Sequence, residues 1–426
     1  MRQLYTVGDQ VLLSAANFLA SIAVMRSAGV EWFGIYSFIV VVATFFHGLF
    51  ASMIFGQMTL TIATSRARAR ETFFAATVRQ QVGIYLAGAA LLGAAAAVPA
   101  WRDAFARYAP EIAVAVLYTV LLSMFDLFKR YLYVADEQRR SFLYTSAYFA
   151  LFLVLLGAVF LFAPAEHVVR LVLASFVAAL GASVLTNRFC LDAMRRAKPL
   201  PWRDVRRLLG RYGRQGRFSV LGTLVTWVQN QSMTPFLMWA SGPTIVGVFN
   251  IARLLVTPVQ IVNTGVSNGI MPQLRRVFRA EGFSALSARI SAIFRFNLAF
   301  TLCYFAALGA AAAMGWLQLL IPEFDDVRPY LGIWAAITLA TLYRTWITQF
   351  FIAAIDFSFL LKASVYGAVA TFSGMLLCHF VFDDDYATVA MILVGELVLI
   401  ERLSRRKRSS CRAEREAAAR EGAGAG

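Results

Sequence analysis

Five ionisable side chains stand inside or beside long apolar stretches of this 426-residue chain. They are Arg253, Arg344, Asp9, Asp126 and Glu396. A charge at the centre of a bilayer costs about 2.5–3.5 kcal/mol on insertion scales, so such residues usually face a cavity or a partner. Arginine binds phosphate oxygens through a planar pair of donors, whereas a carboxylate within a membrane is a candidate for proton transfer.

The arginines are predicted to contact an anionic substrate group. For Arg253 and Arg344 the alternative is a structural ion pair, for example with Glu396 or Asp356. Arg26, at the end of the first apolar run, joins this set. Its alternative role is that of a snorkelling anchor at the membrane surface.

Three amides complete the predicted binding set. Gln229 and Asn230 stand beside Gln231 in one apolar run, and Asn17 is the counterpart of Asn230 in an earlier run. Amides can bind sugar hydroxyls, or they can link neighbouring helices. Their recurrence in two runs favours a role in substrate binding.

The acids are candidates for ion coupling, and each has a structural alternative. Asp9 near a helix start would be stabilised by the helix dipole. Asp126 precedes Lys129 and Arg130 at helical spacing, which favours an intrahelical pair over coupling. Glu396 interrupts the last apolar run.

The elements that position these residues are predicted to be transmembrane helices. The chain is 59% hydrophobic and 15% charged, with a mean hydropathy of +0.65, against about 45–50% and 25% in soluble domains. Apolar runs of roughly 17–25 residues are long enough to cross the bilayer. Twelve runs fit approximately: 7–25, 32–58, 82–100, 111–135, 141–163, 168–190, 218–240, 245–272, 291–314, 328–354, 361–382 and 386–402.

The basic residues orient these twelve runs. The formal net charge is +16, and 33 of the 40 Lys and Arg residues fall in the segments that alternate on the side of both termini, against five on the other side. This asymmetry predicts cytoplasmic termini. Because the basic residues cluster between apolar runs rather than among exposed aromatics, the charge does not indicate nucleic-acid binding.

An internal repeat divides the chain into halves. The constant shift that places Asn17 on Asn230 also places residues 34–36 on 247–249, Thr44 on Thr257 and the apolar run 82–100 on 295–313. Six spans in each half make the repeats parallel. We therefore expect a six-helix lobe at 1–190, a basic amphipathic linker on anionic phospholipid at 191–217, a second lobe at 218–402, and a basic, disordered tail at 403–426.

Short motifs near the start of each half resemble a known family. Residues 8–10 (Gly-Asp-Gln), 17–18 (Asn-Phe) and 31–36 (Glu-Trp-Phe-Gly-Ile-Tyr) are similar to the opening of bacterial polysaccharide-biosynthesis flippases, as are 246–253 and 271–274. These are O-antigen-type exporters of lipid-linked oligosaccharides in the multidrug/oligosaccharidyl-lipid/polysaccharide superfamily.

The resemblance implies a fold, a substrate and a location. The fold is a V of two six-helix lobes, as in MATE-like transporters, in the bacterial inner membrane. The substrate is an oligosaccharide on undecaprenyl pyrophosphate, moved by alternating access. The implied partners are this lipid-linked glycan and polysaccharide polymerase machinery. No cofactor is implied.

Three other functions stay open. A MATE-type drug/cation antiporter would have the same fold with an acidic, aromatic cleft. The major facilitator fold also has six plus six spans, but its usual loop after the second span is absent at 65–70. A membrane glycan polymerase or acyltransferase would need a large outside loop or a clear catalytic acid or His. We expect no enzyme activity, because nucleophile, phosphate-loop and metal motifs are missing and the four cysteines have no metal spacing.

Overall fold

The computed structural model describes residues 2–52, 67–96, 109–197, 203, 220–321, 324–354 and 356–424. These residues are almost entirely helical, and no strand occurs in the described ranges. The chain forms two compact units, at residues 1–224 and 225–426. Helices satisfy their backbone hydrogen bonds internally, which is what an apolar chain needs in lipid.

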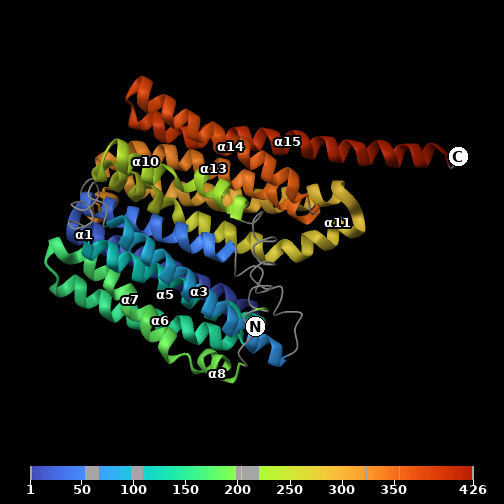
Figure 1. The fold of residues 1–426 in the computed structure, drawn as a ribbon. Helices are drawn as coiled ribbons and strands as arrows, with labels where there is room; N and C mark the ends of the chain where they lie inside the picture. Colours follow the sequence, from blue (N-terminus) through green and yellow to red (C-terminus); the bar gives the residue numbers. More distant parts are fainter. Residues whose placement is uncertain are drawn as a thin grey trace. The chain divides into compact units, whose positions relative to one another are not determined.

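The first unit is built from long helices that pack side by side. They are α1 (Arg2–Phe50), α3 (Ala67–Ala96), α5 (Ala109–Val134), α6 (Gln138–Phe162), the short η2 (Ala165–His167), α7 (Val168–Thr186) and α8 (Arg188–Arg196). Helix α1 packs on α5, α6 and α7, and α7 also packs on α5 and α6 (Figure 1). Stacked aromatics such as Phe152 on Phe176 join α6 to α7.

The second unit opens within the helical residues 220–231. There follow α10 (Met233–Ala240), α11 (Pro243–Ala313), α12 (Trp316–Leu320), α13 (Phe324–Ala354), α14 (Phe357–Leu377), the π-helical η3 (Cys378–Phe382) and α15 (Asp385–Gly424). Helix α13 packs against α11 and α15, and α14 lies along α15 (Figure 1).

Glycines with positive φ interrupt the helical path at corresponding places. Gly29 (φ 83°, ψ 178°) divides α1, and Gly242 (φ 84°, ψ −179°) precedes α11. Only glycine adopts this conformation readily. The shift that places Asn17 on Asn230 also places Gly29 on Gly242, so the same break recurs at the spacing of the predicted repeat. A further break at Gly282 (φ 80°, ψ −163°) divides α11 into two helices.

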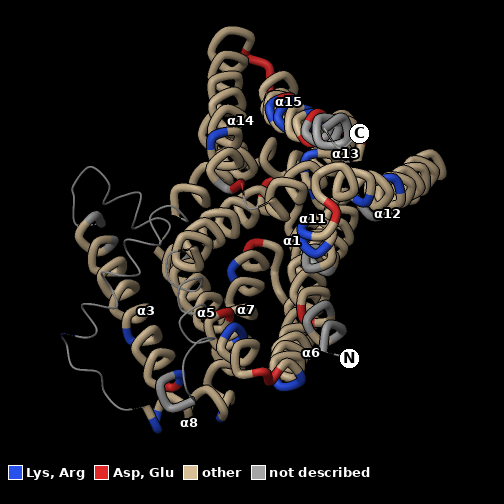
Figure 2. Tube along the Cα trace, turned by 90° about the vertical axis from the view of Figure 1, so that its right-hand side faces the viewer, with Lys and Arg blue, Asp and Glu red and all other residues tan. Residues whose placement is uncertain are grey.

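Seven stretches of the described residues are long and apolar enough to cross a membrane. Two of them, Gly8–Phe50 and Gln273–Ala313, have 43 and 41 residues. At about 1.5 Å per residue each exceeds the roughly 30 Å needed for one crossing. Most of each long helix carries neither acidic nor basic residues (Figure 2). The chain is therefore a multi-pass helical membrane protein. The count of twelve spans and the side of the termini stay predictions.

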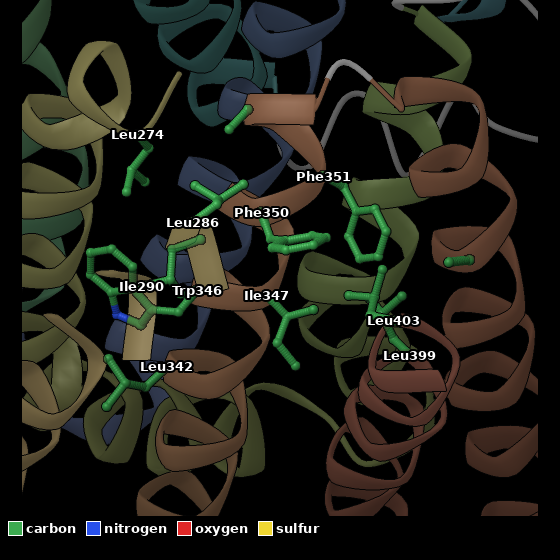
Figure 3. Close-up of a cluster of buried hydrophobic side chains, with 12 residues drawn as sticks. Leu274, Leu286, Ile290, Leu342, Trp346, Ile347, Phe350, Phe351, Leu399 and Leu403 are labelled. Carbon is green, nitrogen blue, oxygen red and sulfur yellow. The ribbon is translucent and has the colours of Figure 1, made fainter. Parts of the chain in front are cut away.

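An apolar cluster holds the second unit together where α11 breaks. Leu274 and Leu286 come from the two sides of Gly282, Trp346 and Phe350 come from α13, and Leu403 comes from α15 (Figure 3). All five side chains are at most 2% exposed. Burying a large apolar side chain contributes about 1.5–3 kcal/mol, so this cluster is a strong link between the three helices.

The C-terminal tail differs from its prediction, and most of the predicted linker lies outside the described residues. The tail predicted to be disordered is helical to Gly424, as a continuation of α15. Ion pairs one turn apart, Arg405 with Glu401 and Arg412 with Glu416, support that helix. The predicted amphipathic linker falls mostly outside the described residues, apart from α8 and Arg203.

Candidate functional site

The second unit contains a buried cluster of one acid, one base and one amide. Glu396 of α15 is fully buried. Its Oε2 lies 2.6 Å from Nε of Arg344 in α13, and its Oε1 accepts a 3.4 Å hydrogen bond from Nε2 of Gln229. The structure thus joins two residues of the predicted binding set, Arg344 and Gln229, with an acid predicted for ion coupling, Glu396. It also confirms the structural ion pair between Arg344 and Glu396.

Close packing of α14 on α15 lets Glu396 reach these partners. A Cβ on Gly395 would collide with the side chain of Thr371 and the backbone of Gly367. A Cβ on Gly367 would in turn press against the amide of Gln229. The missing side chains allow the helices to approach, as small residues do in membrane helix pairs.

Arg253 has a different environment. Its Nη1 donates a 2.7 Å hydrogen bond to Oε1 of Gln231, and its guanidinium lies 5.5 Å from the centre of the Trp334 ring. The Trp334 indole donates to the carbonyl of Phe249, which fixes the ring. Within the described residues Arg253 forms no ion pair, so its charge is balanced only by an amide dipole and an aromatic face.

The first unit holds its own buried acid. Asp9 is fully buried, and its Oδ2 accepts hydrogen bonds from the hydroxyls of Tyr133 and, at 2.7 Å, Ser141. Its Oδ1 is buried without a hydrogen-bond partner among the described residues. Buried Lys129 lies 5.8 Å from the centre of the Tyr133 ring and interacts electrostatically with Asp9.

The environment of Asp9 corrects the dipole interpretation. Helix α1 begins at Arg2, so Asp9 lies beyond the first turn, where the dipole effect has largely decayed. Two hydroxyls from α5 and α6 stabilise the carboxylate instead. A buried carboxylate oxygen without a hydrogen-bond partner is costly, and among the described residues Oδ1 of Asp9 is such an atom.

Asp126 lies in a second polar group of the first unit. Its Oδ2 is 2.9 Å from Nε of Arg130, one turn away in α5, which confirms the predicted intrahelical pair. It also lies 3.6 Å from Nε2 of His47, whose Nδ1 is 3.0 Å from Oγ of Ser123. No pattern in the sequence singles out His47 for this contact.

The remaining predicted binding residues do not join these clusters. Arg26 and Asn17 are exposed on α1. Asn230 donates a 3.0 Å hydrogen bond to the carbonyl of Thr226 in its own helix. Asp356 caps α14 through the amide of Phe359 rather than pairing with Arg344. Among the described residues no three His, Cys, Asp or Glu side chains could hold a metal ion.

The fold resembles solved transporters over nearly the whole chain. A multidrug resistance MATE family transporter of the MOP superfamily in an inward-facing conformation is 13% identical, with a TM-score of 0.65 over 98% of this chain and 96% of that one. The outward-facing conformation of such a transporter matches with 14% identity and a TM-score of 0.60 over 97% and 95%. These likenesses establish the MATE transporter fold.

A third similar structure comes from Pyrococcus furiosus. It is a MOP superfamily transporter, described by a reverse polarity of its binding pocket that suggests a different function. It is 13% identical, with a TM-score of 0.60 over 96% of this chain and 94% of that one. No family model and no curated protein sequence matches the chain. The fold is thus established without a substrate.

Proposed function

We propose that this chain is an ion-coupled secondary transporter of the MATE-type antiporter class that exports organic cations. The observation that carries coupling is Asp9, a fully buried carboxylate with one oxygen left unpartnered among the described residues. A buried carboxylate in a membrane helix is a candidate for carrying the coupling ion. The transporter fold supports export by alternating access.

The pairing of Arg344 argues against a strongly cationic passage. Arg344 was predicted to bind an anionic headgroup, but its Nε lies 2.6 Å from Oε2 of Glu396, and this carboxylate neutralises its charge. The other arginine in the interior of an apolar run, Arg253, has no carboxylate partner in the described residues. A separate reason favours the antiporter over the lipid-linked oligosaccharide flippase: two of the similar structures are described as multidrug resistance MATE family transporters.

If Asp9 couples transport to an ion gradient, its substitution should reduce gradient-driven uptake into proteoliposomes. A pH gradient should drive uptake of a fluorescent organic cation by the wild type, and Asp9→Asn should reduce that uptake at least about tenfold, because the amide cannot take up a proton. Asp192→Asn is the matched control, since Asp192 is a half-exposed acid on α8 of the same unit. Full gradient-driven uptake by Asp9→Asn would reject the coupling role.

Flipping of a lipid-linked oligosaccharide is the second candidate function. Arg253 favours it, because an arginine balanced by Gln231 and Trp334 alone retains its charge for a phosphate. The P. furiosus structure is described as having reversed pocket polarity, so this fold alone does not fix substrate charge. Under this function the partners would be the lipid-linked glycan and polymerase machinery, in a bacterial inner membrane.

The second candidate makes its own prediction. If a diphosphate lipid is the substrate, Arg253→Ala should abolish flipping and Arg253→Lys should retain part of it, since lysine keeps the charge but loses the planar fork. If an organic cation is the substrate, removing the charge of Arg253 should not reduce uptake. Fluorescence-quench flipping and cation uptake, measured on the same preparations, distinguish the two.

A further inference from the structure

The C-terminal part of α15 reaches back to the break in α11. Glu414 accepts hydrogen bonds from the backbone amides of Phe283 (2.7 Å) and Ser284 (2.8 Å) and from the Ser284 hydroxyl (2.8 Å). These are the first amides after Gly282, and the first amides of a helix have no acceptor within it. A side chain from a distant part of the sequence therefore caps the second helix of α11.

Gly282 leaves the space that this carboxylate fills. A Cβ at Gly282 would lie on the Glu414 carboxylate, and the positive φ disfavours other residues in any case. The backbone conformation and the carboxylate thus fit one another. A charged acceptor at a helix start also gains from the helix dipole.

Other contacts hold the same part of α15 in place. Sγ of Cys411 lies 3.9 Å from the carbonyl of Phe283, and buried Leu403 belongs to the apolar cluster around the break (Figure 3). Lys407 packs 5.5 Å from the centre of the Phe350 ring, and its burial lowers the pKa of its ammonium group. Several side chains on the C-terminal part of α15 therefore contact α11 and α13, in addition to Glu414.

Glu414 and Glu396 lie on one face of α15. At about 3.6 residues per turn, the two positions are separated by about five whole turns. One face of a single helix therefore carries the acid that binds Arg344 and the acid that binds the Gly282 break. Contacts at both ends fix the rotation of α15 against α13 and α11.

We propose that Glu414 is an intramolecular latch, which clamps the C-terminal helix onto the Gly282 break and holds the two halves of α11 and the end of α15 as one rigid group. The apparent tail is then an integral part of the second unit. Release of the latch frees the amides of Phe283 and Ser284 and loosens the helix beyond Leu403.

Hydrogen exchange of the full-length protein in nanodiscs tests the latch. Electron-transfer fragmentation resolves single amides, and those of Phe283 and Ser284 should be protected in the wild type, although helix-initiating amides ordinarily exchange fast. Glu414→Ala should speed their exchange about tenfold or more, because a charged hydrogen-bond acceptor is lost. A chain that ends at Arg412 should behave like Glu414→Ala.

Glu416→Ala is the matched control. Glu416 is an acid on the same helix, and it pairs with exposed Arg412. Its loss should leave the exchange of Phe283 and Ser284 unchanged. Fast exchange of these two amides in the wild type, or equal exchange in Glu414→Ala and Glu416→Ala, would overturn the latch. The measurement needs no substrate, so it stands or fails independently of the proposed transport.

Discussion

The buried pair of Arg344 and Glu396 ties α13 to α15 at the cost of desolvating two charges. Such a pair is a weak source of net stability, but removing one partner leaves an uncompensated buried charge. Gln229 supplies a further donor to the carboxylate. This arrangement explains how an arginine and a glutamate can persist between helices that are largely apolar.

Arg344→Ala should therefore destabilise the second unit by about 3–5 kcal/mol. The double variant Arg344→Met, Glu396→Leu should recover most of this loss, because both charges are then gone. Thermal unfolding of the purified protein measures the difference. Arg195→Ala is the control and should be neutral within about 0.5 kcal/mol, since its pair with Asp192 is exposed. A single variant that melts like the wild type would contradict the account.

At this scale only part of the site could be predicted from the sequence. An unusual charge in an apolar run is visible directly, so Asp9, Arg344 and Glu396 could be found. Their partners could not: Tyr133 and Ser141, both distant from Asp9 along the chain, meet it only because α1 packs on α5 and α6. Ordinary hydroxyl residues give no local signal of such a contact.

The pattern of apolar residues predicts the positions of the helices better than it predicts the contacts of single side chains. Runs of apolar residues predicted helices wherever the structure describes them, and the breaks at Gly29 and Gly242 stand at the spacing of the predicted repeat. The interruptions were predicted too, because Gly29, Gly242 and Gly282 lie in the gaps between the predicted apolar runs, at 26–31, 241–244 and 273–290. The positive φ of these glycines was not, because the residue type does not reveal its φ. The helical tail was also missed, since its stability comes from contacts with α11 and α13.

The two breaks make a paired prediction. Gly29→Ala and Gly242→Ala should each cost about 1–3 kcal/mol, because a Cβ strains this backbone conformation even where space is open. Gly157→Ala is the control: it lies within α6 with open space around it, and should stabilise by up to about 1 kcal/mol. Melting curves of the three variants provide the comparison. Equal behaviour of all three would show that the breaks carry no strain for alanine.

For the whole molecule, the placement of the basic residues predicts one membrane orientation. The asymmetry of 33 basic residues against five predicts twelve spans with both termini on the cytoplasmic side. The orientation matters for the proposed transport, because alternating access would expose a substrate first on one side of the membrane and then on the other.

Cysteine labelling tests that orientation. In a chain whose native cysteines are replaced, Glu166→Cys, exposed in η2, should react with an impermeant maleimide added to intact cells. Ser409→Cys, exposed on α15, should react only after the membrane is opened. Both positions lie on exposed surface, so reactivity reports the side of the membrane. Labelling of Ser409→Cys in intact cells would reverse the orientation.

Ion-coupled export of organic cations is the function proposed for the whole molecule. The most direct test reconstitutes the purified wild type into proteoliposomes and measures two activities side by side: cation uptake driven by a pH gradient, and flipping of a lipid-diphosphate oligosaccharide. We expect gradient-dependent cation uptake that collapses when the gradient is dissipated, and no flipping above protein-free vesicles. Flipping without any cation uptake would contradict the proposal and assign the protein to lipid-linked glycans instead.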